Sequence, residues 1–309
     1  MRRRGSALRA AMALVCTLCA GAAQGCQSLL GIDSNRYVVD AGEDEMEPAS
    51  EAGPDVSDAA DAMEARVEPA GFACLNDPPV MALPGNLEFD WILTDVSTAS
   101  TSDSSAGTPL VGATATACSK LDLDCSTPVA TAITDAHGTA ILTLPGNFDG
   151  YYQAEATGYP TGVFTRPPLL RSELVSSPMP NIATINAAPF LVSVTQEPSN
   201  TVAIVSIFDC NSAAVEGATL SIGDPGPSEQ AFYFQDSYPT ASATSTDSTG
   251  SVIIFNVPPG TMSLTATLPN STQTLPAVTA IARGPGDAGT PWVSYVAIRP
   301  QQATVNAPP

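Results

Sequence analysis

The sequence predicts an all-β protein made of two tandem β-sandwich domains of the Greek-key type, and two observations support this. Helix formers such as Leu, Glu, Lys and Gln are outnumbered by Ala, Thr, Ser, Val, Pro and Gly. Such a composition favours short strands joined by turns. Two stretches of the chain also repeat each other at a domain-sized offset, which indicates a duplication. The predicted division is 1–25, an export segment; 26–70, an acidic tether; 71–190, the first sandwich; and 191–309, the second.

The N-terminus has the parts of a secretory signal. Arg2, Arg3, Arg4 and Arg9 precede an apolar run that extends to about residue 23. A basic start, an apolar core and small residues before the cleavage site are typical of a signal peptide. The run is too short for a membrane-spanning helix, which needs about 20 residues. We therefore expect the chain to be exported.

Cys26 follows this segment directly, in Ala-Gln-Gly-Cys. The stretch resembles a bacterial lipobox, in which small residues precede a cysteine that is acylated and becomes the mature N-terminus. Ala23 and Gln24 depart from the usual pattern, so ordinary cleavage after Ala22 or Ala23 is the open alternative. If Cys26 is lipidated, Gln27 after it implies sorting to the outer membrane. The membrane would then be a partner through the lipid.

An acidic stretch follows from residue 40 to residue 68, with eleven acidic side chains and one basic side chain, Arg66. High charge with little apolar content cannot repay the entropy of ordering, so the stretch is predicted to be a disordered tether. The whole chain has a formal net charge of -20. A surface of this sign repels a phosphate backbone, so we expect no nucleic-acid partner.

Two short motifs recur in the body. Gly-Ala-Thr occurs at 112–114 and again at 217–219, and Thr-Asp-x-x-Gly occurs at 134–138 and again at 246–250. In the second motif the Asp caps a turn through its own backbone and the Gly adopts a positive φ, which closes a hairpin. Each turn is followed by an apolar strand that ends in proline. The sequence thus predicts one sandwich per repeat.

These motifs, together with Val-Pro-Pro-Gly-Thr-Met-Ser-Leu-Thr-Ala at 257–266, resemble the carboxypeptidase regulatory-like domains. The resemblance extends from about residue 202 to residue 300 and is weaker in the first repeat, where residues 145–151 depart from the family pattern. It implies a transthyretin-like seven-stranded sandwich. In the family such domains are spacers, folding aids or adhesive modules, and the motifs carry no active site.

Four cysteines remain after Cys16, Cys19 and Cys26 are set aside, and an even number in an exported chain predicts disulfides. Four cysteines allow three pairings. We favour Cys118 with Cys125, which closes a short acidic loop, and Cys74 with Cys210, which ties the start of the body to the second repeat.

The chemistry of hydrolases is hard to build from this chain. His137 is the only histidine and lies in the predicted turn between Asp135 and Gly138. No nucleophile-elbow sequence is present. The carboxylate pairs that remain, Glu88 with Asp90 and Asp122 with Asp124, lack a convergent aromatic cleft, so we expect no enzyme. No cofactor is expected either, apart from Ca²⁺ on Asp122, Asp124, Asp135 and Asp247, whose alternative role is turn capping.

Aromatic residues cluster in segment 223–240, the longest departure between the repeats, and we predict a loop there. Loops carry function on sandwiches, and stacked aromatic rings suit a sugar, although core packing is the alternative. The leading prediction is a non-catalytic, lipid-anchored cell-envelope protein with a structural or adhesive role. The second is an accessory protein that binds a glycan or peptide through Phe232, Tyr233, Phe234 and Tyr238.

Overall fold

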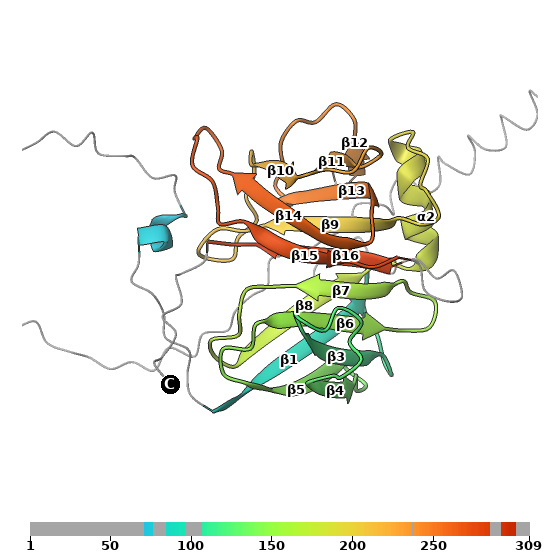
Figure 1. The fold of residues 1–309 in the computed structure, drawn as a ribbon, viewed down its shortest axis with the longest axis vertical. Coiled ribbons are helices and arrows are strands. Elements are labelled where there is room, and N and C mark those ends of the chain that lie inside the picture. The colour runs from blue at the N-terminus through green and yellow to red at the C-terminus, as the bar shows by residue number, and fades with distance from the viewer. Residues whose placement is uncertain (1–70, 77–84, 97–106, 237, 285–291, 301–309) are drawn as a thin grey trace, which may run out of the picture.

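The computed structural model describes residues 71–76, 85–96, 107–236, 238–284 and 292–300. Its first half is a sandwich of two sheets (Figure 1). One contains β1 (Asn86–Asp95), β2 (Thr108–Pro109), β5 (Thr139–Pro145) and β8 (Glu173–Met179). The facing strands are β3 (Thr114–Ser119), β4 (Ala130–Ile133), β6 (Gly150–Glu155) and β7 (Thr161–Thr165).

The second half repeats this plan. A three-stranded sheet contains β10 (Thr219–Gly223), β14 (Gly260–Thr267) and β15 (Val278–Ala282). The strands that face it are β9 (Thr201–Ile207), β11 (Gln230–Gln235), β12 (Tyr238–Thr240), β13 (Ser251–Val257) and β16 (Trp292–Ile298). The prediction of β-sandwiches is confirmed.

The two halves share one sheet. Strand β16 pairs in parallel with β9 of its own half and also in parallel with β7 of the first half. This double pairing produces a continuous nine-stranded sheet in the order β12-β11-β13-β9-β16-β7-β6-β3-β4. Figure 1 shows β16 and β7 running side by side where the upper and lower halves meet.

The two smaller sheets lie on opposite faces of this common sheet. Alternating residues of β9 face different cores: Ile204 belongs to the core that contains the first-half residues Trp91 and Tyr152, whereas Val205 belongs to the core that contains Leu264 of β14. The single α-helix of the described residues, α2 (Ile182–Leu191), adds Ile185 and Ala188 to the first core. It covers the face of the second half that the three-stranded sheet leaves open. Among the described residues, no helix has the length and apolar character to cross a membrane.

The duplication seen in the sequence is a duplication of topology. Strand β1 pairs with β5 and β8, and β9 pairs in the same senses with β13 and β16. Likewise β6 lies between β3 and β7, as β14 lies between β10 and β15.

The recurring motifs form the same hydrogen-bond network in both halves. Thr134 Oγ1 accepts the N–H of Ala113 at 2.8 Å and donates to the Leu110 carbonyl. Thr246 Oγ1 accepts the N–H of Ala218 at 2.9 Å and donates to the Val215 carbonyl. In each half, the threonine of Thr-Asp-x-x-Gly therefore fixes the backbone around the Gly-Ala-Thr motif.

The turn glycines are required for two reasons. Gly138 and Gly250 have φ values of +74° and +63°, as the motif predicts. A Cβ would also lie 2.6 Å from the Leu93 carbonyl oxygen at Gly138, and 2.7 Å from the Ile207 carbonyl oxygen at Gly250.

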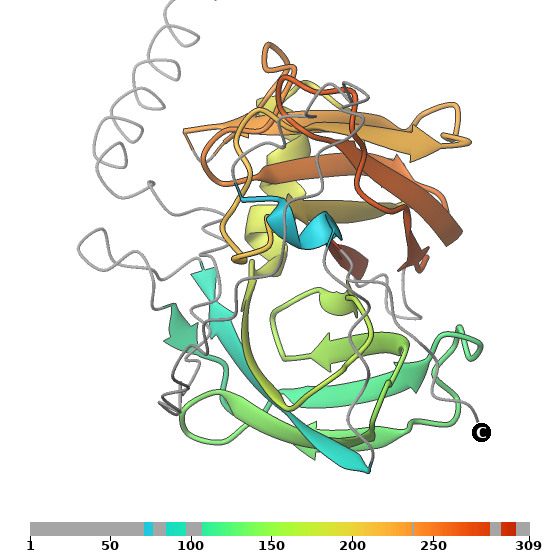
Figure 2. The same cartoon turned by 90° about the vertical axis from the view of Figure 1, so that its left-hand side faces the viewer.

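The start of the body docks on the second half. The 3₁₀ turn η1 (Ala73–Asn76) is joined by the Cys74–Cys210 disulfide, and Phe72 packs into the core around Leu264. Figure 2 shows this blue turn beside the yellow and orange elements. The predicted export segment 1–25, Cys26 and the tether 26–70 lie outside the described residues.

Candidate functional site at the junction of the two halves

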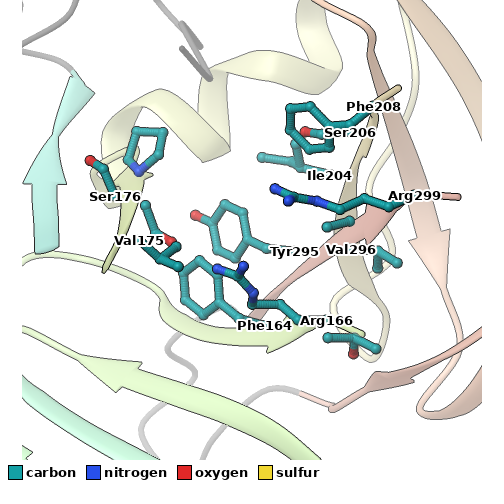
Figure 3. A pocket seen from close by; sticks show the side chains of 14 residues that line it. Phe164, Arg166, Val175, Ser176, Ile204, Ser206, Phe208, Tyr295, Val296 and Arg299 are labelled. Carbon is teal, nitrogen blue, oxygen red and sulfur yellow. The ribbon is translucent and has the colours of Figure 1, made fainter. Parts of the chain in front are cut away.

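A pocket opens where the halves meet, between β8 of the first half and β9 and β16 of the second (Figure 3). Its volume is about 60 Å³. Tyr295 of β16 lies at its centre, with Arg166 and Arg299 on either side. The apolar residues of its lining include Phe164, Val175, Pro178, Ile204 and Phe208.

Aromatic stacking holds Tyr295 in place. Its ring lies parallel to the ring of Phe164, with centroids 4.3 Å apart, and Phe164 in turn meets Trp91 edge-on at 4.8 Å. Tyr295 is 8% exposed, and burial raises the pKa of its phenol. The hydroxyl therefore stays neutral and keeps its proton for donation. Its oxygen has no hydrogen-bond partner among the described residues.

The two arginines are both positioned by aromatic rings. The Arg166 guanidinium lies 5.4 Å from the Phe89 ring centre, and its Nη2 is 3.2 Å from Glu173 Oε1. The Arg299 guanidinium lies 4.7 Å from the Phe208 ring centre, and its Nη1 donates to Ser212 Oγ at 3.2 Å. Cation–π contacts of this kind orient a guanidinium.

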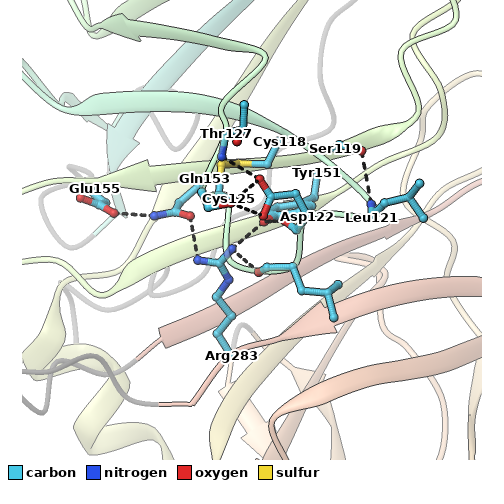
Figure 4. Close-up of a disulfide and its surroundings, with 12 residues drawn as sticks. Cys118, Ser119, Leu121, Asp122, Cys125, Thr127, Tyr151, Gln153, Glu155 and Arg283 are labelled. Carbon is cyan, nitrogen blue, oxygen red and sulfur yellow. Dashed lines mark hydrogen bonds between the residues drawn. A yellow bond between two sulfur atoms is a disulfide. The ribbon is translucent and has the colours of Figure 1, made fainter.

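Arg283, which follows β15, contacts both halves on the face of the common sheet opposite to the pocket (Figure 4). Its guanidinium lies between two rings, 5.4 Å from the centre of Tyr151 and 4.9 Å from that of Trp292. It donates to the Leu123 carbonyl, inside the loop that the Cys118–Cys125 disulfide closes. A residue of the second half therefore fastens the disulfide loop of the first.

Both disulfides join the cysteines that the sequence analysis favours. The Tyr151 hydroxyl donates to the Asp122 carbonyl at 2.6 Å and accepts a hydrogen bond from Arg283. Burial of this phenol raises the pKa of Tyr151. The short disulfide loop is therefore held by side chains from both halves.

The aromatic segment 223–240 departs from the prediction, because much of it is not a loop. It forms β11 and β12, which pair with each other and extend the common sheet through β13. Phe234 is 1% exposed in the first core, Phe232 lies against Phe255, and the Tyr233 hydroxyl accepts the Leu220 N–H at 2.9 Å. Tyr238 is half-buried on β12. The packing of Phe232, Tyr233 and Phe234 follows the core-packing alternative.

Two of the carboxylates that the sequence singled out cap turns, whereas Glu88 and Asp90 lie within strand β1. Asp135 accepts the N–H groups of His137 and Thr139, and these bonds lower its pKa. Asp122 accepts the Thr127 N–H at 2.8 Å, which lowers its pKa likewise. Within the described ranges no group of three or more His, Cys, Asp or Glu side chains could hold a metal ion.

Sequence reasoning missed the junction. Arg166, Arg283, Arg299 and Tyr295 stand in no motif. One signal was available: Trp-Val-Ser-Tyr-Val-Ala-Ile at 292–298 is almost continuously apolar, which is typical of a strand buried on both faces.

No family model matches the chain, and no curated protein matches it in sequence. Solved structures similar to it include the Bacillus anthracis TIE protein (13% identity, TM-score 0.23, covering 69% of this chain and 34% of that one). Another is a mutant shaft pilin SpaA from Lactobacillus rhamnosus GG (12% identity, TM-score 0.24, covering 70% of this chain and 99% of that one). A third is the major pilin subunit BcpA of Bacillus cereus (10% identity, TM-score 0.21, covering 71% of this chain and 100% of that one). The chain thus spans about a third of the first protein. TM-scores this low carry no functional assignment.

Proposed function

We propose that the chain is an exported, lipid-anchored, non-catalytic protein of the cell envelope with a structural or adhesive role. The observation that supports this best is the shared strand β16. Two sandwiches that each lend strands to one sheet cannot turn against each other without breaking backbone hydrogen bonds. Such a body suits a stiff spacer or a presenting module.

Three further features agree with the proposal. The two disulfides are typical of proteins that fold in an oxidising compartment. The second module, 191–309, resembles the carboxypeptidase regulatory-like domains from about residue 202 to residue 300, and the first module, 71–190, does so more weakly; in that family such domains serve as spacers or adhesive units. The acidic stretch between Cys26 and the body would act as the tether, and Gln27 would direct the protein to the outer membrane. The alternative of glycan or peptide binding at 223–240 gains no support from the packed rings of β11 and β12.

Mass spectrometry and membrane fractionation of the chain made in a Gram-negative host test the anchor. We expect an acyl mass increment on a mature chain that begins at Cys26, and its loss in Cys26→Ala. Cys19→Ala is the matched control, because Cys19 would leave with the export segment. A soluble, unmodified mature chain that begins before Cys26 would refute the anchor.

A further inference from the structure

The nine-stranded common sheet ends at β4. Among the described residues β4 pairs with β3 alone, and Figure 1 shows it at the end of the molecule opposite β12. The Thr134 N–H donates to the Ala113 carbonyl at 2.9 Å. Because hydrogen bonds alternate along an antiparallel strand, the backbone N–H and C=O groups of Thr131 and Ile133 point away from β3. An edge of this kind is a template for a further strand.

The other strands at sheet ends carry features that hinder such pairing. Strands β10 and β15 each have a backbone group that is hydrogen-bonded by a side chain of the facing sheet. Four more strands contain a proline, which has no N–H to donate: Pro109 of β2, Pro145 of β5, Pro178 of β8 and Pro239 of β12. Strand β4 contains neither a proline nor a charged residue. Its edge is therefore the least protected of these strands.

Apolar side chains gather along the same edge. The described residues include nine large hydrophobic side chains that are exposed, and five of them lie in or next to β3 and β4: Val111, Leu121, Leu123, Val129 and Ile133. Ile133 alone is 69% exposed. Thr131 is exposed as well, whereas Ala130 and Ala132 lie against the first core. A gathering of exposed apolar side chains beside an open strand indicates an interaction surface.

The sequence of this edge is symmetric about Thr131. Residues 129–133 read Val-Ala-Thr-Ala-Ile, so an alanine and then a β-branched residue stand on either side of the threonine. A two-fold contact requires a surface that is complementary to itself, and an antiparallel strand meets its own copy in reverse order. Thr131 then lies opposite Thr131 of the second copy, and Val129 lies opposite Ile133 of the second copy. Pairs of threonines and of β-branched residues stabilise antiparallel strands.

We propose that two copies of this chain associate through β4, which pairs antiparallel with β4 of the second copy about Thr131. The two Thr131 residues exchange both of their backbone hydrogen bonds, and the common sheet continues from one copy into the other. The contact is short and the chain has a formal net charge of -20, so the association is weak and strengthens with salt, which screens the repulsion. This inference goes beyond the envelope role proposed above, which does not require self-association.

Sedimentation equilibrium of the full chain over a series of concentrations tests the contact. We expect a monomer–dimer equilibrium. Thr131→Lys and Thr131→Glu each remove the threonine pair and place like charges opposite each other, so each should weaken dimerisation about tenfold. An equimolar mixture of the two variants should recover dimers, because opposite charges then face each other. Leu174→Lys is the matched control, since it adds a charge at an exposed position of the edge strand β8 and should dimerise as the parent does.

The mixture also separates a lost contact from a lost fold, because two misfolded variants would not recover dimers together. A parent chain that stays monomeric at every concentration overturns the proposal and leaves the edge to a strand of another protein. Dimers that both Thr131 variants form as readily as the parent overturn it as well, because the contact would then lie elsewhere. So does a mixture that associates no more tightly than either variant alone.

Discussion

The two halves have the same strand topology but differ in what covers their equivalent strands. Strand β1 alternates between buried and more exposed residues, whereas its counterpart β9 is buried throughout. The same contrast separates β5 from β13, and β8 from β16. In the first half the outer face of this sheet meets solvent. In the second half the equivalent face meets α2 and the core of the first half.

The side chains of β8 and β16 explain this difference in burial. Strand β8 contains Pro178, which has no N–H to donate, and prolines in sheets are confined to edges and bulges. Strand β16 has no proline and is almost continuously apolar, so it can be paired on both sides and buried on both faces. Of these two equivalent strands, β8 is thus an edge strand, and β16 is the strand that joins the two halves.

The largest expected difference concerns the disulfides. Cys74–Cys210 closes a span of 136 residues and Cys118–Cys125 a span of 7. Loop-closure entropy predicts that replacing the first pair by alanines lowers the free energy of unfolding by about 5 kcal/mol, against about 2 kcal/mol for the second. Denaturant unfolding without reductant measures both. Equal decreases in the free energy of unfolding would show that the Cys74–Cys210 disulfide stabilises the fold no more than the short Cys118–Cys125 disulfide.

The contribution of β16 to stability is tested by substitutions at equivalent positions of β16 and β8. Leu93 and Ile207 both donate to the carbonyl of the turn glycine, so Asp90 and Ile204 correspond, as do their partners Leu174 and Tyr295. Tyr295→Ala removes a buried ring from the joint and should cost about 3–5 kcal/mol.

Leu174→Ala is the control for that substitution. Leu174 is 45% exposed on the edge strand, so its replacement should cost about 1 kcal/mol or less. Urea titration of both variants measures the contrast. Similar losses at the two positions would mean that β16 is no more central than β8.

Substitution of the turn threonines tests whether the recurring motif contributes equally to stability in both halves. Thr134→Val and Thr246→Val each remove a buried hydroxyl and leave the N–H of Ala113 or Ala218 without that acceptor. Each should lower the free energy of unfolding by about 1–3 kcal/mol, and by similar amounts. Thermal unfolding of the two variants compares them. A loss at only one site would break the equivalence of the motifs.

The smallest expected effect is a pH dependence in the first turn. Hydrogen bonds from the backbone of Thr139 and His137 hold the pKa of Asp135 below its ordinary value of 3.8. A lowered folded pKa contributes stability that is present above pH 3.8 and is lost as the pH falls through the folded pKa. We expect an NMR titration of the Asp135 carboxyl to show the lowered midpoint, and Asp135→Asn to flatten this part of the acid-stability profile. A midpoint at or above 3.8 would contradict it.

Local chemistry was sufficient for much of the fold. The strand-rich composition, the duplicated Thr-Asp-x-x-Gly turns with Gly138 and Gly250, and the expectation of disulfides among four cysteines all follow from the sequence, which left three pairings open. Each depends on residues a few positions apart or on a small set of cysteines. The aromatic segment 223–240 shows where this reasoning fails, because its rings enter a core that forms only when β11 pairs with β13.

The tertiary structure alone decided how the halves are joined. The pairing of β16 with β7 brings Tyr295 to Phe164 across 131 positions, and Arg283 reaches the loop of Cys118 and Cys125 across a comparable distance. Contacts of such range leave no periodicity and no spacing in the sequence. Their selection rests on the apolar area that the assembled sheets bury together, a quantity that belongs to the packed molecule and to no segment of it.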